Sequence, residues 1–104
     1  MGGAAVGAFC AKGNIRAVVG RGTGAIKYCY ERELQLNPTL SGKVVLAWTV
    51  GLTGSVMKAY VQSSSLGNSK VESCMLRVVK RWRFEPPKGG LCAISYPFVF
   101  KGAQ

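Results

Sequence analysis

A chain of 104 residues forms one domain, and its 14 Lys and Arg residues against four Glu residues give a net charge of +10. This charge favours anionic partners such as nucleic acid, an acidic protein, or an anionic polymer or lipid surface. The chain has no histidine and no aspartate, and its glutamates form no catalytic pair. Serine-histidine, cysteine-histidine and histidine-metal chemistry are therefore excluded, and we expect neither an enzyme nor a cofactor nor a metal site.

The N-terminal segment, residues 1–13, is rich in glycine and alanine, and we expect a flexible linker remnant followed by a domain over residues 14–104. The segment lacks the basic start and long apolar run of a signal peptide. If the protein is exported or anchored, the signal lies upstream of this sequence. No apolar run reaches the ~18 residues that suggest a membrane-spanning helix.

The first helix is predicted from residue 15, because Ile15, Val18, Ile26 and Cys29 recur at helical spacing. Asn14 is suited to cap its start, and Asn37-Pro38 ends it. Three glycines, at positions 20, 22 and 24, lie inside it, and each costs about 1 kcal/mol relative to alanine. They predict either a bent or frayed helix or a reason for the helix backbone to approach a neighbour closely.

A hairpin follows the turn after Pro38. Residues 44–50 place alternate apolar side chains on one face of a strand, residues 51–54 form a loop with two glycines, and the return strand covers residues 56–61. The opposite face of the first strand carries Val45 and Ala47. This face is less polar than a solvated face, which suggests that a partner or a second protomer covers it.

The second helix begins at Ser69, which forms a capping-box pattern with Glu72, and it ends before Pro86-Pro87. Residues 92–100 alternate onto one face and predict the last strand. Pro97 cannot donate to a sheet ladder, so this strand is expected to be an edge strand or to contain a bulge. The order α-β-β-α-β predicts an α+β fold with two helices packed on one face of a three-stranded antiparallel sheet, in the order last-first-second.

The four cysteines lie at positions suited to disulfides. Cys29 and Cys74 fall on the apolar faces of the two helices, which cover the same sheet face, so we expect a Cys29–Cys74 bridge. Cys92 lies on the inward face of the last strand, and Cys10 lies in a segment that can reach it, so a second bridge is possible. The alternatives are buried reduced cysteines and the other two pairings. No C-x-x-C pair supports a zinc site, and disulfides indicate an oxidising compartment.

A series of motifs runs along the chain: "YCYERELQLNP", "SSSLGN", "VESC", "RWRFEPPKGG" and "SYPFVF". In this order they resemble the TonB C-terminal domain superfamily, and within it the AgmX/PglI-type domains at the C-terminal end of envelope proteins of gliding bacteria. The resemblance covers residues 15–100. The chain departs from it at the three glycines of the first helix and at Cys10 and Cys92.

This resemblance implies a non-catalytic periplasmic domain of an inner-membrane protein, whose N-terminal anchor lies outside this sequence. It implies energy transduction, in which the domain binds an outer-membrane or periplasmic partner and transmits force in a motility or transport machine. A partner peptide would add as a strand to the edge of the last strand. It also implies contact with peptidoglycan, an anionic polymer. Carried onto this chain, the partner-binding edge strand consists of Ile94, Ser95, Tyr96, Phe98, Val99 and Phe100.

Two other interpretations concern the surface. A basic nucleic-acid-binding domain is the alternative function, although we expect no nucleic-acid partner. An exposed edge and an apolar outer sheet face also allow a homodimer. The nucleic-acid interpretation rests on the basic patch and its two interleaved aromatic residues: Arg77, Lys80, Arg81, Arg83 and Lys88, with Trp82 and Phe84.

Overall fold

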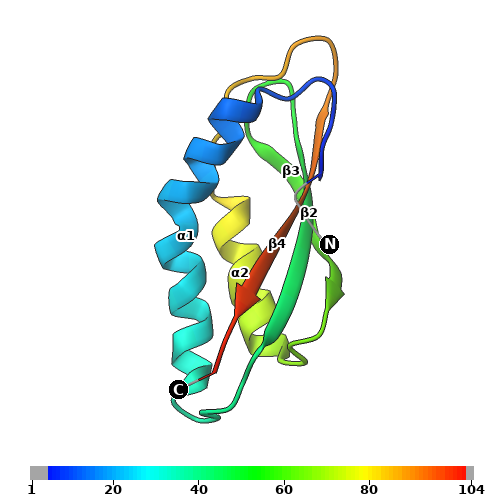
Figure 1. Cartoon of the computed structure of the whole chain (residues 1–104). Coiled ribbons are helices and arrows are strands. Elements are labelled where there is room, and N and C mark those ends of the chain that lie inside the picture. Colours follow the sequence, from blue (N-terminus) through cyan, green and yellow to red (C-terminus); the bar gives the residue numbers. More distant parts are fainter. Residues whose placement is uncertain (1–4, 103–104) are drawn as a thin grey trace.

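The computed structural model describes residues 5–102 and shows a layer of two helices against a layer of sheet (Figure 1). Neither helix in this part of the chain combines the length and the apolar character needed to cross a bilayer. The elements follow one another as β1 (Ala5–Val6), α1 (Lys12–Leu34), β2 (Gly42–Val50), β3 (Val56–Ser64), α2 (Ser69–Lys80) and β4 (Cys92–Phe100).

The sheet has four antiparallel strands in the order β1-β4-β2-β3. The three long strands have the expected neighbours, but the prediction of three strands is wrong, because β1 adds a fourth beside β4. The order of elements along the chain therefore also differs from the predicted one. A strand of two residues in a segment rich in glycine and alanine shows no period-two pattern, so only its pairing with β4 identifies it.

The N-terminal segment expected to be a linker remnant contains β1 and the start of α1. Residues 1–4 of that segment lie outside the described residues. The expected domain boundary before residue 14 stays a prediction, since folding of a chain without the first 13 residues is what would test it.

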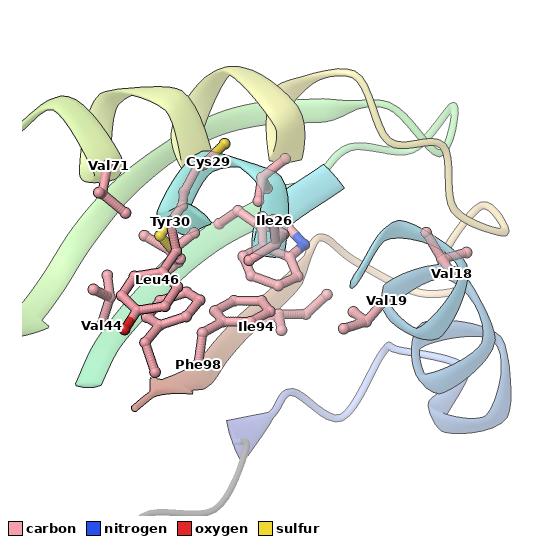
Figure 2. Packing of buried hydrophobic residues seen from close by; sticks show 14 of the residues in the cluster. Val18, Val19, Ile26, Cys29, Tyr30, Val44, Leu46, Val71, Ile94 and Phe98 are labelled. Atoms are coloured by element: carbon pink, nitrogen blue, oxygen red, sulfur yellow. The ribbon is translucent and has the colours of Figure 1, made fainter. Parts of the chain in front are cut away.

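The core lies between the two helices and one face of the sheet. Figure 2 shows Ile26 and Tyr30 of α1 gathered with Leu46 of β2 and Phe98 of β4. Burial of apolar surface contributes about 25 cal/mol per Å² and is the main favourable term in folding. Most buried side chains of the sheet alternate along the two central strands: Val44, Leu46, Trp48 and Val50 in β2, and Cys92, Ile94, Phe98 and Phe100 in β4. Ala47, on the opposite face of β2, is also buried.

Helix α1 is continuous from Lys12 to Leu34, so fraying at the glycines is not observed. Asn14 does not cap it, because the helix already begins at Lys12. The N-cap residue is Ala11, which has no side chain that could accept a hydrogen bond. The Asn14 side chain instead accepts a hydrogen bond of 2.7 Å from the backbone N–H of Glu85. This bond ties the first turn of α1 to the segment before β4.

The close approach offered as an alternative for the glycines is present at Gly22. A Cβ atom on Gly22 would lie 2.4 Å from Cζ2 of the Trp82 indole. That indole packs edge-on against Trp48, with ring centroids 5.8 Å apart, and also against Phe84. Because the indole packs against the rings of Trp48 and Phe84, it has little room to move away from α1. The helix can therefore lie this close to the indole only if residue 22 has no side chain.

Three glycine-to-alanine substitutions in α1 are expected to separate packing from helix propensity. Gly22→Ala should lower the free energy of unfolding by about 1–3 kcal/mol, because the new methyl group overlaps Trp82. Gly20→Ala and Gly24→Ala should each raise it by up to about 1 kcal/mol, because no atom lies within 4 Å of either new Cβ. Urea unfolding followed by circular dichroism measures all three. Equal effects at the three positions would contradict this account of Gly22.

Helix α2 begins one residue earlier than a Ser69 cap requires. Asn68 is the N-cap, and its side chain accepts a hydrogen bond of 3.0 Å from the backbone N–H of Val71. Glu72 does not complete a capping box, because its carboxylate accepts a hydrogen bond of 2.7 Å from the Ser64 hydroxyl at the end of β3. The cap and this contact together connect the start of α2 to the sheet.

Candidate partner-binding edge and groove

One edge of β4 is only partly covered. On one side, β4 pairs with β2 along its whole length, from Cys92 to Phe100. On the other side, β1 pairs only with Ile94 and Ser95, and the N–H of Gly7 donates to the carbonyl of Ala93 over 2.9 Å. Among the described residues, the outer edge from residue 96 to residue 100 therefore has no strand beside it. This is the C-terminal part of the edge that the sequence analysis assigned to a partner.

Pro97 faces this open edge. In an antiparallel sheet, the hydrogen-bonding groups of successive residues point alternately to opposite sides of the strand. The bond from Gly7 to Ala93 shows that Ala93 points away from β2, so Ser95, Pro97 and Val99 do the same. Pro97 thus removes no hydrogen bond from the β2–β4 ladder, and the pairing there is regular, without a bulge. Proline is tolerated in this strand because its missing N–H lies on the edge.

A groove of about 500 Å³ runs between the open edge and α1. The wall formed by α1 includes Val19, Gly20 and Thr23, and the first two lie four and three residues before Thr23, on the same side of the helix. Gly20 has no atom within 4 Å of where its Cβ would lie, so its missing side chain leaves room in the groove. The full lining is Arg16, Val19, Gly20, Thr23, Ile26, Lys27 and Tyr30 from α1, with Tyr96, Pro97, Phe98, Val99, Phe100 and Lys101.

The charged residues that line the groove are all basic. They are Arg16 and Lys27 on α1 and Lys101 after β4, and no acidic side chain is among the lining residues. Lys27 has a contact of 3.9 Å with Glu31 on the exposed side of the helix, where an ion pair contributes little. An acidic segment would thus meet a favourable potential on entering the groove.

Tyr30 closes one end of the groove. Its ring stacks on Phe100 with centroids 4.7 Å apart, and its hydroxyl donates to the carbonyl of Lys101 over 2.7 Å. The same hydroxyl also contacts the carbonyl of Leu40, in the segment before β2. Burial raises the pKa of the Tyr30 phenol above its usual 10.0, because the ionised form is poorly solvated there. This residue fixes the end of β4 against α1.

Replacing Tyr30 with phenylalanine is expected to lower the free energy of unfolding by about 1–3 kcal/mol, since the one hydroxyl proton shared by the carbonyls of Leu40 and Lys101 is lost. Because the pKa of this phenol is higher in the folded state, its contribution is present below pH about 10 and decreases as the pH rises further. Urea unfolding from pH 8 to 11 should show a steeper loss of stability for the parent protein than for Tyr30→Phe. Parallel pH profiles would contradict this account.

Two disulfides are present, with the expected pairings. Cys29 and Cys74 join α1 to α2 with their Cα atoms 5.6 Å apart. Cys10 and Cys92 join the segment after β1 to the start of β4 with their Cα atoms 5.1 Å apart. The first bridge fixes the helix layer, and the second fixes the segment that contains β1.

The basic patch lies mostly outside regular structure. Arg77 and Lys80 belong to α2, whereas Arg81, Arg83 and Lys88 follow it, and all five side chains are exposed. The two aromatic residues between them do not form a stacking surface for bases. Phe84 is buried, and Trp82 is half-buried against Trp48 and Gly22, so both rings complete the core.

The helical wall of the groove, including Arg16, Gly20 and Lys27, was not predicted from the sequence. Their spacing of four and seven residues was visible in the sequence, but residues on the exposed part of a helix give no sign of a neighbouring open strand edge. Within residues 5–102, no cluster of His, Cys, Asp and Glu side chains is arranged to hold a metal ion.

No protein-family model matches the sequence, and no curated protein matches it. Among solved structures, the solution NMR structure of the TonB C-terminal domain of Pseudomonas aeruginosa is similar to this chain, with a TM-score of 0.54 and 24% sequence identity. The similarity covers 72% of this chain and 78% of that one. At this level of identity it shows a shared fold: the chain adopts a fold like that of the TonB C-terminal domain, with two helices on a four-stranded antiparallel sheet.

Proposed function

We propose that this chain is a non-catalytic periplasmic interaction module of an inner-membrane-anchored, TonB-like protein. An extended peptide from an outer-membrane or envelope partner adds as a strand to the outer edge of β4, and the module transmits force to that partner in a motility or transport machine. The observation that carries this proposal is the edge at residues 96–100, which no strand of residues 5–102 covers and which lies beside the groove. Main-chain hydrogen bonds along such an edge supply affinity, and pockets for alternate side chains supply selectivity.

Three features support the periplasmic part of the proposal. The two disulfides require an oxidising compartment in which to form and persist. The fold is like that of a TonB C-terminal domain. The motif series points to the AgmX/PglI-type group of this superfamily, in which the membrane anchor precedes the domain.

The charge of the groove indicates the chemistry of the partner. Arg16, Lys27 and Lys101 line it without an acidic side chain, while Val19 and Ile26 form an apolar floor. A strand whose side chains alternate between apolar and acidic residues would place apolar groups against the floor and carboxylates near the basic residues. We therefore propose an acidic, alternating segment as the partner peptide.

A peptide of nine residues that alternates valine and glutamate tests this proposal. In NMR titrations, it should shift the backbone amide of Val99 and its neighbours. Gly20→Phe, which fills the groove, should weaken binding at least tenfold by removing apolar and main-chain contacts. Gly24→Phe is the matched control, because Gly24 is an exposed glycine of the same helix and does not line the groove. As at Gly20, no atom lies within 4 Å of where its Cβ would be.

Two results would contradict the proposal. Shifts confined to a surface away from residues 96–101 would mean that the edge is not the binding site. Equal binding by a peptide that alternates valine and lysine would mean that the basic lining does not select the partner.

Peptidoglycan and a second copy of the chain are further proposed partners. The exposed basic side chains suit the carboxylates of peptidoglycan, and strand pairing between two copies would use the same open edge. Sedimentation of labelled chain with isolated cell-wall sacculi at low and high salt tests the first. Analytical ultracentrifugation over a hundredfold concentration range tests the second.

Nucleic-acid binding is favoured by the net charge of +10 alone. The aromatic residues within the basic patch belong to the core, which removes the stacking contribution expected at such a surface. A gel shift with random duplex and single-stranded DNA at 50 and 200 mM salt decides this alternative. A shift that weakens steeply at the higher salt would support it, whereas an absent or salt-insensitive shift would remove it.

A further inference from the structure

The N-terminal strand β1 occupies the part of the β4 edge that the groove does not reach. Ala5 pairs with Ser95, and Gly7 donates to Ala93, so the outward-facing groups at these two positions of β4 are already engaged. In Figure 1, β1 and the segment after it lie beside the first half of β4. A partner strand that enters from the other half would meet the start of β1 at Ser95.

Few contacts hold β1 in this place. It comprises two residues, which is too short to persist through ladder hydrogen bonds alone. Val6 packs against the core cluster, and the Phe9 ring lies so close to Gly90 that a Cβ there would be 2.7 Å from it. The Cys10–Cys92 disulfide then ties the segment covalently to the first residue of β4. Cys10 lies only four residues after the end of β1, so the disulfide holds β1 at a high effective concentration beside the edge of β4.

We infer that β1, held by the Cys10–Cys92 disulfide, is a stop that limits a partner strand to residues 96–100 of β4 and fixes its register. This inference rests on the proposed function, because it concerns the same edge. An incoming strand cannot pair with Ser95 or Ala93 while β1 is in place, so its end must lie next to Ala5.

The stop sets how many main-chain hydrogen bonds a partner can make. Two residues of β4 that lie past its pairing with β1 point their backbone groups outward. Pro97 offers only a carbonyl, and Val99 offers an N–H and a carbonyl. A partner of five residues uses all three groups, and a longer one gains nothing further along β4. Without β1, the groups of Ser95 and Ala93 become available as well, and the longer strand should bind about tenfold more tightly.

Removal of the disulfide tests this inference, with Cys10→Ala and Cys92→Ala combined in one variant. The control variant combines Cys29→Ala and Cys74→Ala, which removes the other bridge and leaves β1 stapled. Hydrogen exchange gives a readout without any peptide. The amide of Ser95 should be protected in the parent and the control but exchange much faster in the first variant, whereas Val99 should exchange quickly in all three.

Binding is then measured with valine-glutamate peptides of five and nine residues. In the parent and the control, the two peptides should bind within about twofold of each other and shift only residues 96–101. In the variant without the Cys10–Cys92 bridge, the longer peptide should gain about tenfold and also shift Ser95 and Ala93. Gly7→Pro, which removes the donor to Ala93 and keeps both disulfides, should produce the same change.

The outcomes separate this inference from the proposed function. If the peptides shift residues 96–101 equally in every variant and length has no effect, β1 is not a stop, and the proposed edge site stands. If neither peptide shifts this edge in any variant, both the proposed function and the stop are rejected. A preference of the parent for the longer peptide would overturn the stop alone.

Discussion

Replacing Cys29 and Cys74 together with alanine is expected to lower the free energy of unfolding by about 4 kcal/mol. The bridge spans a sequence separation of 45 residues, and closing a loop of that length restricts the unfolded chain by about this amount. In a domain of this size, such a loss lowers the melting temperature by roughly 15–30 °C. The effect is large because the net stability of a small domain is only about 5–15 kcal/mol.

Calorimetry of the parent and the double variant, both without added reductant, measures this loss. The parent measured with reductant is the control, because reduction breaks both bridges and should destabilise it at least as much as the double substitution does. A loss below about 1 kcal/mol would mean that α1 and α2 are held together by packing alone and that the bridge contributes little.

Replacing Trp48 with alanine is expected to lower the free energy of unfolding by about 3–5 kcal/mol, the range for a large aromatic side chain in a packed core. Trp48 is 2% exposed and lies two residues before the end of β2. Its ring contacts the rings of Trp82, Phe84 and Tyr96, so its removal leaves a cavity bordered by β4 and by the segment that follows α2.

Urea unfolding measures this loss, with Tyr28→Ala as the control. Tyr28 is also aromatic but is 60% exposed on α1, so its truncation should cost no more than about 1 kcal/mol. Similar losses for the two variants would contradict the position of Trp48 at the centre of the core. The Nε1 atom of Trp48 is buried without a hydrogen-bond partner, so Trp48→Phe should cost markedly less than Trp48→Ala.

The long elements were predictable because their signals are local. Apolar residues at helical spacing identified α1 and α2, alternation identified β2 and β4, and the glycine loop of a hairpin identified β3. The pairing of Cys29 with Cys74 followed from their places on the apolar faces of two helices that cover one sheet face. Errors remained at the ends, where Asn68 rather than Ser69 caps α2, because neighbouring polar residues compete for the same role.

The sequence by itself determined the charge, the scarcity of catalytic groups, the α+β class and the order of the three long strands. Only the tertiary structure decided which part of β4 is open, because that depends on the pairing of β1, a segment too short to carry a pattern. The same holds for the groove, since Gly20, Arg16 and Lys101 meet only when the helix lies beside the end of the strand. Periodicity records which face of an element is buried, whereas a binding edge depends on which elements become neighbours.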